Sequence, residues 1–168
     1  MKKLLKLFLL LVIIGLTVRI VDEQRAVARL KDISPVFDEE APVVSVSAEE
    51  EIFRLRLYKN SAAKDFLKHL PQTLVMTRWG EGAYGVRLDK KTEKLRDTSD
   101  KRRAFFKGEV VFYPKRNLLF LMFGTTPVAL TVDAPMLLAS GGIPLGRLES
   151  WTGLEQMMGV VEFTFEVK

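Results

Sequence analysis

The alternation of apolar and polar residues divides the chain into three parts. An apolar run at residues 7–16 follows Lys2, Lys3 and Lys6. Residues 22–42 then carry mixed charge, two prolines and little apolar periodicity, which is typical of a linker. Between residues 43 and 168, apolar positions recur at every second residue in several stretches. That period predicts strands with one buried face.

Two stretches show the strand pattern most clearly. In residues 51–58, the apolar Phe53, Leu55 and Leu57 alternate with arginines, and residues 160–168 alternate valine and phenylalanine with polar residues. Further strands are predicted at residues 43–47, 72–79 and 143–150, and a hairpin at residues 108–113 and 118–123 around a turn at 114–117.

Two short helices are predicted within this pattern. Asn60 and Ser61 are good N-cap residues for a helix over residues 62–70, and Pro71 cannot continue that helix. Residues 151–158 have the length of a helix of about two turns.

The elements together predict the fold class. Residues 89–103 are polar and strand-poor and are interpreted as a long loop, and residues 124–142 are interpreted as another long connection. Long alternating strands with few edge signals favour a closed β-barrel. We therefore expect a mostly β domain over residues 43–168 with two short helices, preceded by an N-terminal hydrophobic helix and a linker.

The N-terminal segment, residues 1–21, has the layout of an export signal. Lysines before an apolar run stay in the cytoplasm, so the chain that follows is translocated. A helix from Leu4 to Val21 would span roughly 27 Å, close to a hydrocarbon core of about 30 Å. The small residues of Ala26-Val27-Ala28 offer a cleavage site. Three alternatives stay open: a retained membrane anchor, a cleaved signal peptide and a buried helix. The first two predict an extracytoplasmic domain, membrane-anchored, periplasmic or secreted.

Composition excludes several kinds of chemistry. The 168 residues contain no cysteine and a single histidine, His69, so disulfides, thiolate zinc sites, thiol nucleophiles and multi-histidine metal sites are excluded. The sequence also has no Ser-His-Asp order, paired-carboxylate motif, phosphate-binding loop or zinc-ligand spacing. We expect neither a metal nor a cofactor.

The net charge of +5 comes from one segment. Residues 78–107 hold ten Lys or Arg against five acidic residues. Such a segment is either a solvated loop or a surface for anionic lipid or polymer. Aromatic residues follow Lys101-Arg102-Arg103 but do not alternate with it as in single-strand binders, so we expect no nucleic-acid partner. The oligomeric state is left open.

Five motifs follow one another along the predicted domain. They are LYKNSAAKDFLKHLPQTLVM from Leu57, WGEGAYG from Trp79, KGEVVFYPKRNLLFLMFGTTP from Lys107, IPLGRLESWTGLEQM from Ile143 and VEFTFE from Val161. Their order resembles the small prokaryotic cyclophilin-like family, most of whose members have no assigned function. The resemblance covers Ser47 to Val167 and implies a compact barrel closed by helices at its ends.

The resemblance does not extend to the residues of cyclophilin isomerases. Those enzymes carry a Phe-His-Arg stretch and a Gln-Gly-Gly-Asp-type stretch. Here Lys68 precedes His69, and Gly141-Gly142 has neither the glutamine nor the aspartate. No position matches the catalytic arginine, so we expect ligand binding without prolyl isomerase activity. A divergent peptidyl-prolyl cis-trans isomerase is the alternative.

Three residues of the glycine-rich stretch TRWGEGAYG are candidates for a ligand-binding cleft. Trp79, Glu81 and Tyr84 match the strand-end stretch of the family, and rings with one carboxylate are suited to a peptide or a ring-bearing ligand. The alternative is a glycine turn whose tryptophan covers the core.

Four further residues complete the predicted cleft. Phe123, Thr125 and Thr126 follow the most apolar strand, where their side chains either face a ligand or bond local backbone. Arg147 is a lone cation in a predicted strand, which either clamps a carboxylate or pairs with Glu149 or Glu81. The predicted ligand is a peptide or a small molecule.

Overall fold

The computed structural model describes residues 2–31, 36–89, 101–124 and 136–168 of the chain. It divides into two compact units, Met1–Ser34 and Pro35–Lys168. The first unit consists of helix α1, Lys2–Lys31. This helix ends ten residues beyond the predicted 1–21 segment, within the predicted linker. Large apolar side chains along it, including Phe8 and Val18, are exposed.

Within the described residues, no helix combines the length and apolar character required to cross a membrane.

The second unit begins before residue 43, where the barrel was expected to start. Phe37 forms an isolated antiparallel bridge with Tyr58, and the Asp38 amide donates to the Leu57 carbonyl at 2.9 Å. Part of the predicted linker is therefore hydrogen-bonded to the barrel domain.

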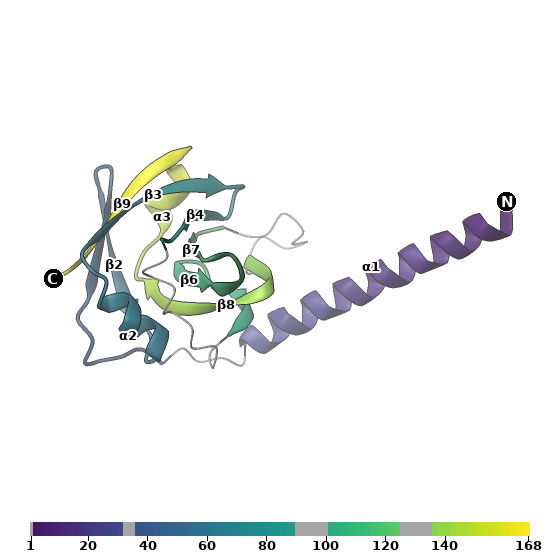
Figure 1. Ribbon diagram of the computed structural model, residues 1–168, viewed down its shortest axis with the longest axis horizontal. Helices are drawn as coiled ribbons and strands as arrows, with labels where there is room; N and C mark the ends of the chain where they lie inside the picture. Colours follow the sequence, from purple (N-terminus) through teal and green to yellow (C-terminus); the bar gives the residue numbers. More distant parts are fainter. Residues whose placement is uncertain (1, 32–35, 90–100, 125–135) are drawn as a thin grey trace. The chain divides into compact units, whose positions relative to one another are not determined.

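Eight strands form the predicted closed barrel (Figure 1). All their pairings are antiparallel, in the order β2-β1-β9-β3-β4-β7-β6-β8, and β8 pairs with β2 to close the cylinder. The prediction of a closed β-barrel is confirmed. The strands are β1 Val44–Ala48, β2 Glu51–Leu57, β3 Gln72–Trp79, β4 Ala83–Arg87, β6 Glu109–Tyr113, β7 Leu118–Met122, β8 Met136–Leu148 and β9 Val160–Val167.

Alternate side chains fill the barrel, as the strand pattern predicts. Leu55 of β2 and Phe163 of β9 are fully buried in this core. Helix α2, Ser61–Leu67, adds Phe66, whose ring meets Phe165 edge-on at 5.7 Å. The Asn60 side chain caps α2 by accepting the Ala63 amide at 2.8 Å, as expected from the sequence.

Helix α3, Thr152–Gln156, lies within the second predicted helix and contributes the buried Leu154 to the barrel core. The hairpin β6–β7 also follows the prediction. Its turn contains the short 3-10 helix η2, Pro114–Arg116, and then Asn117 in the left-handed conformation.

Three strand segments were not predicted. Strand β4 occupies part of the glycine-rich stretch, β5 (Arg102–Phe105) lies at the end of a predicted loop, and β8 begins at Met136 inside the other predicted loop. Residues 90–100 and 125–135 of those loops lie outside the described residues. Strand β5 pairs with the first half of β8, outside the closed cylinder.

A second apolar cluster lies on the outer face of the barrel. It explains why every residue of β7 is buried, although a barrel strand was expected to bury one face only. Phe105 of β5 belongs to this cluster, and Leu138 of β8 packs against it. Its buried members are Ala83, Phe105, Val111, Leu118, Phe120 and Met122.

Candidate functional site

A groove of about 300 Å³ lies on the outer face of β3, β4 and β7. Its wall includes the ring of Trp79, and its rim includes two arginines, Arg87 of β4 and Arg116 of η2. The remaining lining residues are Val75, Thr77, Gly85, Val86 and Leu118.

Glycine at position 85 allows the aromatic wall of this groove to form. The rings of Trp79 and Phe120 meet edge-on at 5.2 Å beside Gly85. A Cβ at residue 85 would lie 2.7 Å from the Phe120 ring and 3.3 Å from the Trp79 ring nitrogen. Only glycine therefore fits between these rings without displacing them. Trp79 keeps 44% of its surface exposed, so its ring is available to a ligand.

The cations of the groove lie in solvent. Arg87 and Arg116 are both exposed, and neither forms an ion pair with any residue in the described part of the chain. Among the residues that the structure describes, no carboxylate lines the groove. The groove therefore combines an aromatic wall with two arginines whose charge no described lining residue neutralises.

The structure does not bring Trp79 and Tyr84 together. Tyr84 is fully buried in the barrel core, where its ring lies 5.4 Å from that of Phe123. Trp79 pairs with Ala83 across β3 and β4, so successive side chains place Trp79 and Tyr84 on opposite faces of the sheet. The expectation that Trp79, Tyr84 and Phe123 line one cleft is therefore corrected, because two of these rings belong to the interior.

Glu81 lies exposed in the turn between β3 and β4 and does not line the groove. In the same turn, the Gly82 carbonyl accepts hydrogen bonds from the Phe123 and Gly124 amides, at 2.9 and 3.0 Å. The glycine-rich turn thus closely contacts the end of β7. The predicted residues Thr125 and Thr126 lie outside the described residues.

Arg147 lies on the other side of the cylinder from Trp79. Counting round the closed barrel in either direction, β8 is four strands from β3. Arg147 on β8 and Trp79 on β3 therefore belong to separate surfaces, which corrects the expectation of a single shared cleft.

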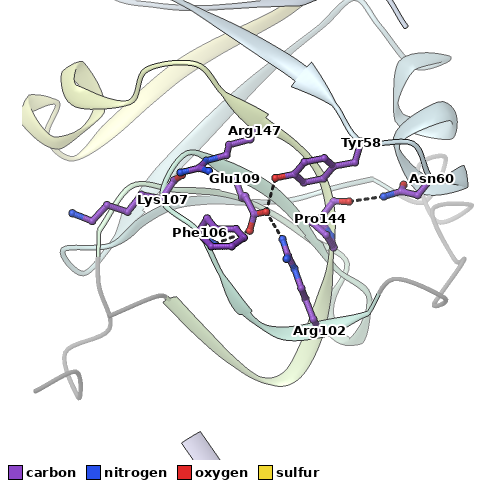
Figure 2. Close-up of polar contacts among 8 residues, drawn as sticks. All are labelled: Tyr58, Asn60, Arg102, Phe106, Lys107, Glu109, Pro144 and Arg147. Atoms are coloured by element: carbon purple, nitrogen blue, oxygen red, sulfur yellow. Dashed lines mark hydrogen bonds and ion pairs between the residues drawn. The ribbon is translucent and has the colours of Figure 1, made fainter. Parts of the chain in front are cut away.

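A buried ion pair occupies the barrel surface beside Arg147. Glu109, the first residue of β6, is completely buried although its neighbour Val110 is the residue that faces the barrel core. Its Oε1 accepts the Tyr58 hydroxyl at 2.7 Å and an Nη of Arg102, and its Oε2 accepts the Phe106 amide at 2.8 Å. Figure 2 shows Tyr58 and Arg102 converging on this carboxylate.

Burial changes the titration of these groups. Loss of water raises the pKa of Glu109 above its ordinary value, although Arg102 and the hydrogen bonds oppose that shift. Burial, with the nearby Glu109 charge, also raises the pKa of the Tyr58 hydroxyl. Tyr58 is therefore a neutral donor at physiological pH.

The sequence provided no clear signal for this ion pair. A glutamate before the apolar VVFY run has the pattern of a solvent-facing residue, and Arg102 was assigned to a polar loop. The pair forms because β5 crosses the outer face of the barrel, which depends on pairing between segments far apart in sequence.

Arg147 is held between two aromatic rings. Its guanidinium carbon lies 5.2 Å from the ring centroids of both Phe106 and Trp151, and its Nε donates to the Lys107 carbonyl at 3.0 Å. Neither carboxylate suggested by the sequence pairs with it in the described residues, since Glu149 instead lies 3.6 Å from Arg54.

A metal site is absent from the part of the chain that the structure describes, where no group of three or more potential ligand side chains is suitably placed.

The amino-acid sequence matches the Cyclophilin-like family over residues 46–166, and the chain belongs to that family. No curated protein matches the chain. Among solved structures, the chain is similar to the solution structure of the hypothetical protein AF2241 from Archaeoglobus fulgidus. The two share 17% identity with a TM-score of 0.54, over 80% of this chain and 98% of the archaeal one. At that identity the likeness shows a common fold, and that fold is the cyclophilin-like barrel.

Proposed function

We propose that the domain binds an anionic ligand with an apolar or aromatic part, either a small molecule or the end of a peptide, in the groove beside Trp79. The observation that carries this proposal is the combination in one groove of about 300 Å³ of a half-exposed tryptophan with two exposed arginines.

The chemistry of the lining supports this ligand class. An aromatic ring offers a large rigid apolar surface, and arginine bonds carboxylates through paired N–H groups. The groove lies at the lower end of the size range of ligand pockets, about 300–1,000 Å³. A ligand with one ring and one carboxylate is therefore of suitable size and charge.

The groove can be tested by the fluorescence of Trp79. The chain has two tryptophans, so Trp151→Phe leaves Trp79 as the only reporter. We expect the tripeptide Ala-Ala-Phe with a free carboxylate to change this fluorescence saturably, and its amide to bind at least about tenfold more weakly, since the amide cannot form the charged pair.

A matched pair of variants assigns the effect to the groove. Arg87→Gln combined with Arg116→Gln should weaken binding of the free tripeptide, whereas Arg54→Gln, an exposed arginine on β2 outside the groove, should not. Equal binding of acid and amide, or equal binding by both sets of variants, would contradict the proposal.

The proposed role is binding without prolyl isomerisation. The isomerase stretches have no counterpart in the sequence, and the catalytic arginine therefore has no matching position. A protease-coupled assay on Xaa-Pro peptides should show no acceleration by the protein. Acceleration at nanomolar protein would favour the alternative, a divergent peptidyl-prolyl isomerase.

We also propose that the domain works outside the cytoplasm, either tethered or released. The support is the lysine-then-apolar order of residues 2–16, since a signal peptide needs an apolar region of only about 7–15 residues. Cell fractionation with intact-mass measurement tests this proposal. A mature chain that begins near residue 29 would indicate cleavage after Ala28, and a full-length chain in the membrane fraction would indicate retention. A full-length chain in the cytoplasmic fraction would contradict export.

A further inference from the structure

We propose that Arg147 forms a second binding site, for a carboxylate group, on the side of the barrel away from the groove. This inference does not rest on the groove, because the two sites use different strands and different aromatic residues.

Guanidinium groups and aromatic rings alternate at this site. The guanidinium of Arg102 lies 5.4 Å from the Phe106 ring, and that of Arg147 lies 5.2 Å from the same ring and 5.2 Å from Trp151. Phe106 thus contacts two cations, and Trp151 covers the outer one. Such contacts stabilise a cation that has lost part of its water shell.

The charges of this cluster do not balance within the described residues. Arg102 forms its ion pair with Glu109, and the Lys107 ammonium lies 3.8 Å from a Glu155 oxygen. Arg147 is half-buried and has no carboxylate partner in the described part of the chain. A partly buried cation without a counter-charge is unfavourable, and an anionic ligand would relieve that cost.

Glu109 does not supply the missing charge. It lies opposite Arg147 in the pairing of β6 with β8. Its two oxygens, however, already accept from Tyr58, Arg102 and the Phe106 amide, as Figure 2 shows.

The backbone around Arg147 is fixed in place. The Lys107 carbonyl holds its Nε, and the Gly108 carbonyl accepts the Leu148 amide at 2.8 Å. Gly108 has a φ of +84°, and a Cβ there would lie 2.7 Å from the Trp151 ring. The ring can therefore pack on this residue only because it is glycine. With Nε engaged, the two terminal nitrogens of Arg147 are available to a ligand with two oxygens in one plane.

A carboxylate has that geometry, and the flanking rings favour an organic group attached to it. The carboxylate has two possible sources, the end of a peptide and a small organic acid. In either case the ligand needs the planar guanidinium of arginine, which can donate two parallel hydrogen bonds, as well as its charge.

The fluorescence of Trp151 provides the test. In the full-length Trp79→Phe variant, Trp151 is the only tryptophan. The probes are benzoate, Ala-Ala-Phe with a free carboxylate, its amide, and inorganic phosphate. We expect a saturable change with the free tripeptide, with benzoate, or with both, and at least about tenfold weaker effects from the amide and phosphate. Tighter binding of the tripeptide would identify a peptide end, and tighter binding of benzoate a small acid.

Arg147→Lys in the same background keeps the charge and removes the planar guanidinium, so it should weaken binding of the better probe at least about tenfold. Lys68→Gln, an exposed cation on the α2 side of the barrel, serves as the control and should leave binding unchanged. Urea unfolding of Arg147→Lys verifies that the variant is folded, and Arg147→Gln provides a second variant if it is not. Binding that survives in the folded variant, amide binding equal to acid binding, or preferred phosphate binding would overturn the proposal.

The two proposals fail separately. If only the groove proposal is wrong, ligands change the fluorescence of Trp151 but not that of Trp79. If only the second-site proposal is wrong, ligands change the fluorescence of Trp79 but not that of Trp151.

Discussion

The groove and the buried cluster of Glu109, Arg102 and Tyr58 use the same kinds of residue in opposite ways. Both lie on the outer surface of the barrel and combine arginines with aromatic rings. In the groove, Arg87 and Arg116 lie in solvent. In the cluster, only 13% of the Arg102 side-chain surface is exposed, and its guanidinium pairs with a completely buried carboxylate. The difference is β5, which carries Arg102 across the outer face of the barrel.

The comparison shows how a covering strand changes the role of a cation. Water screens an exposed arginine, which remains free to exchange partners. A buried arginine requires a fixed partner, and its loss leaves an uncompensated charge. Exposed arginines are therefore candidates for ligand binding, and Arg102 is a structural residue that joins β5 to the barrel.

The largest expected effect is on the buried pair. Arg102→Met should lower the free energy of unfolding at neutral pH by about 3–5 kcal/mol, because it leaves the Glu109 carboxylate buried without its cation. Urea denaturation measures the change. The double variant Arg102→Met, Glu109→Leu should recover much of the loss, since it removes both charges. If the double variant loses as much free energy of unfolding as the two single variants lose together, the two ions are not coupled.

The next effect concerns the aromatic wall of the groove. Gly85→Ala should lower the free energy of unfolding by about 1–3 kcal/mol, because the added Cβ overlaps the Phe120 ring. It should also shift the emission of Trp79 in the Trp151→Phe background. An unchanged stability together with an unchanged emission would contradict the close packing of these rings.

A smaller effect is the dependence of stability on pH. Burial raises the pKa of Glu109 above its ordinary value of 4.5, so the folded state retains this proton at a higher pH than the unfolded state. The stability from Glu109 is therefore full below about pH 4.5 and falls as the pH rises through the raised pKa, by at most about 1.4 kcal/mol per pH unit. Urea unfolding of the wild type and Glu109→Gln across this window measures the difference. If the wild type instead becomes more stable relative to the variant as the pH rises, the pKa of Glu109 is lowered in the folded state and the prediction is wrong.

The smallest effect is expected in the groove. Arg87→Gln with Arg116→Gln should change the free energy of unfolding by no more than about 0.5 kcal/mol, because both side chains are exposed and unpaired within the described residues. The same urea assay measures it. A loss as large as that of Arg102→Met would mean that these arginines are structural and would remove the contrast between the two regions.

Much of the barrel could be predicted from local pattern. The alternation in residues 51–58 and 160–168 predicted β2 and β9, and Asn60 predicted the start of α2. The helix ends at Leu67, three residues before the end expected from Pro71. These signals are local, since strand period, capping and chain stiffness depend on neighbouring residues. The ordered motifs also indicated the family that the match over residues 46–166 confirms.

The candidate site was predicted less well, for reasons visible in two residues. Trp79 and Tyr84 are five residues apart, on two strands joined by a turn. The sequence does not show the register in which these strands pair, and the register decides which face each side chain occupies. Tyr84 consequently entered the core, and Trp79 remained at the groove.

The sequence by itself determined the strand periods, the N-cap of α2 and the excess of positive charge, because each depends on neighbouring residues or on composition. The alternating strands also favoured a closed barrel, and the pairing of β8 with β2 closes it. Only the tertiary structure decided which cations are buried, which face each ring occupies and that Glu109 meets Arg102. Those outcomes depend on pairing between distant strands, above all of β5 with β8, and on the register of that pairing.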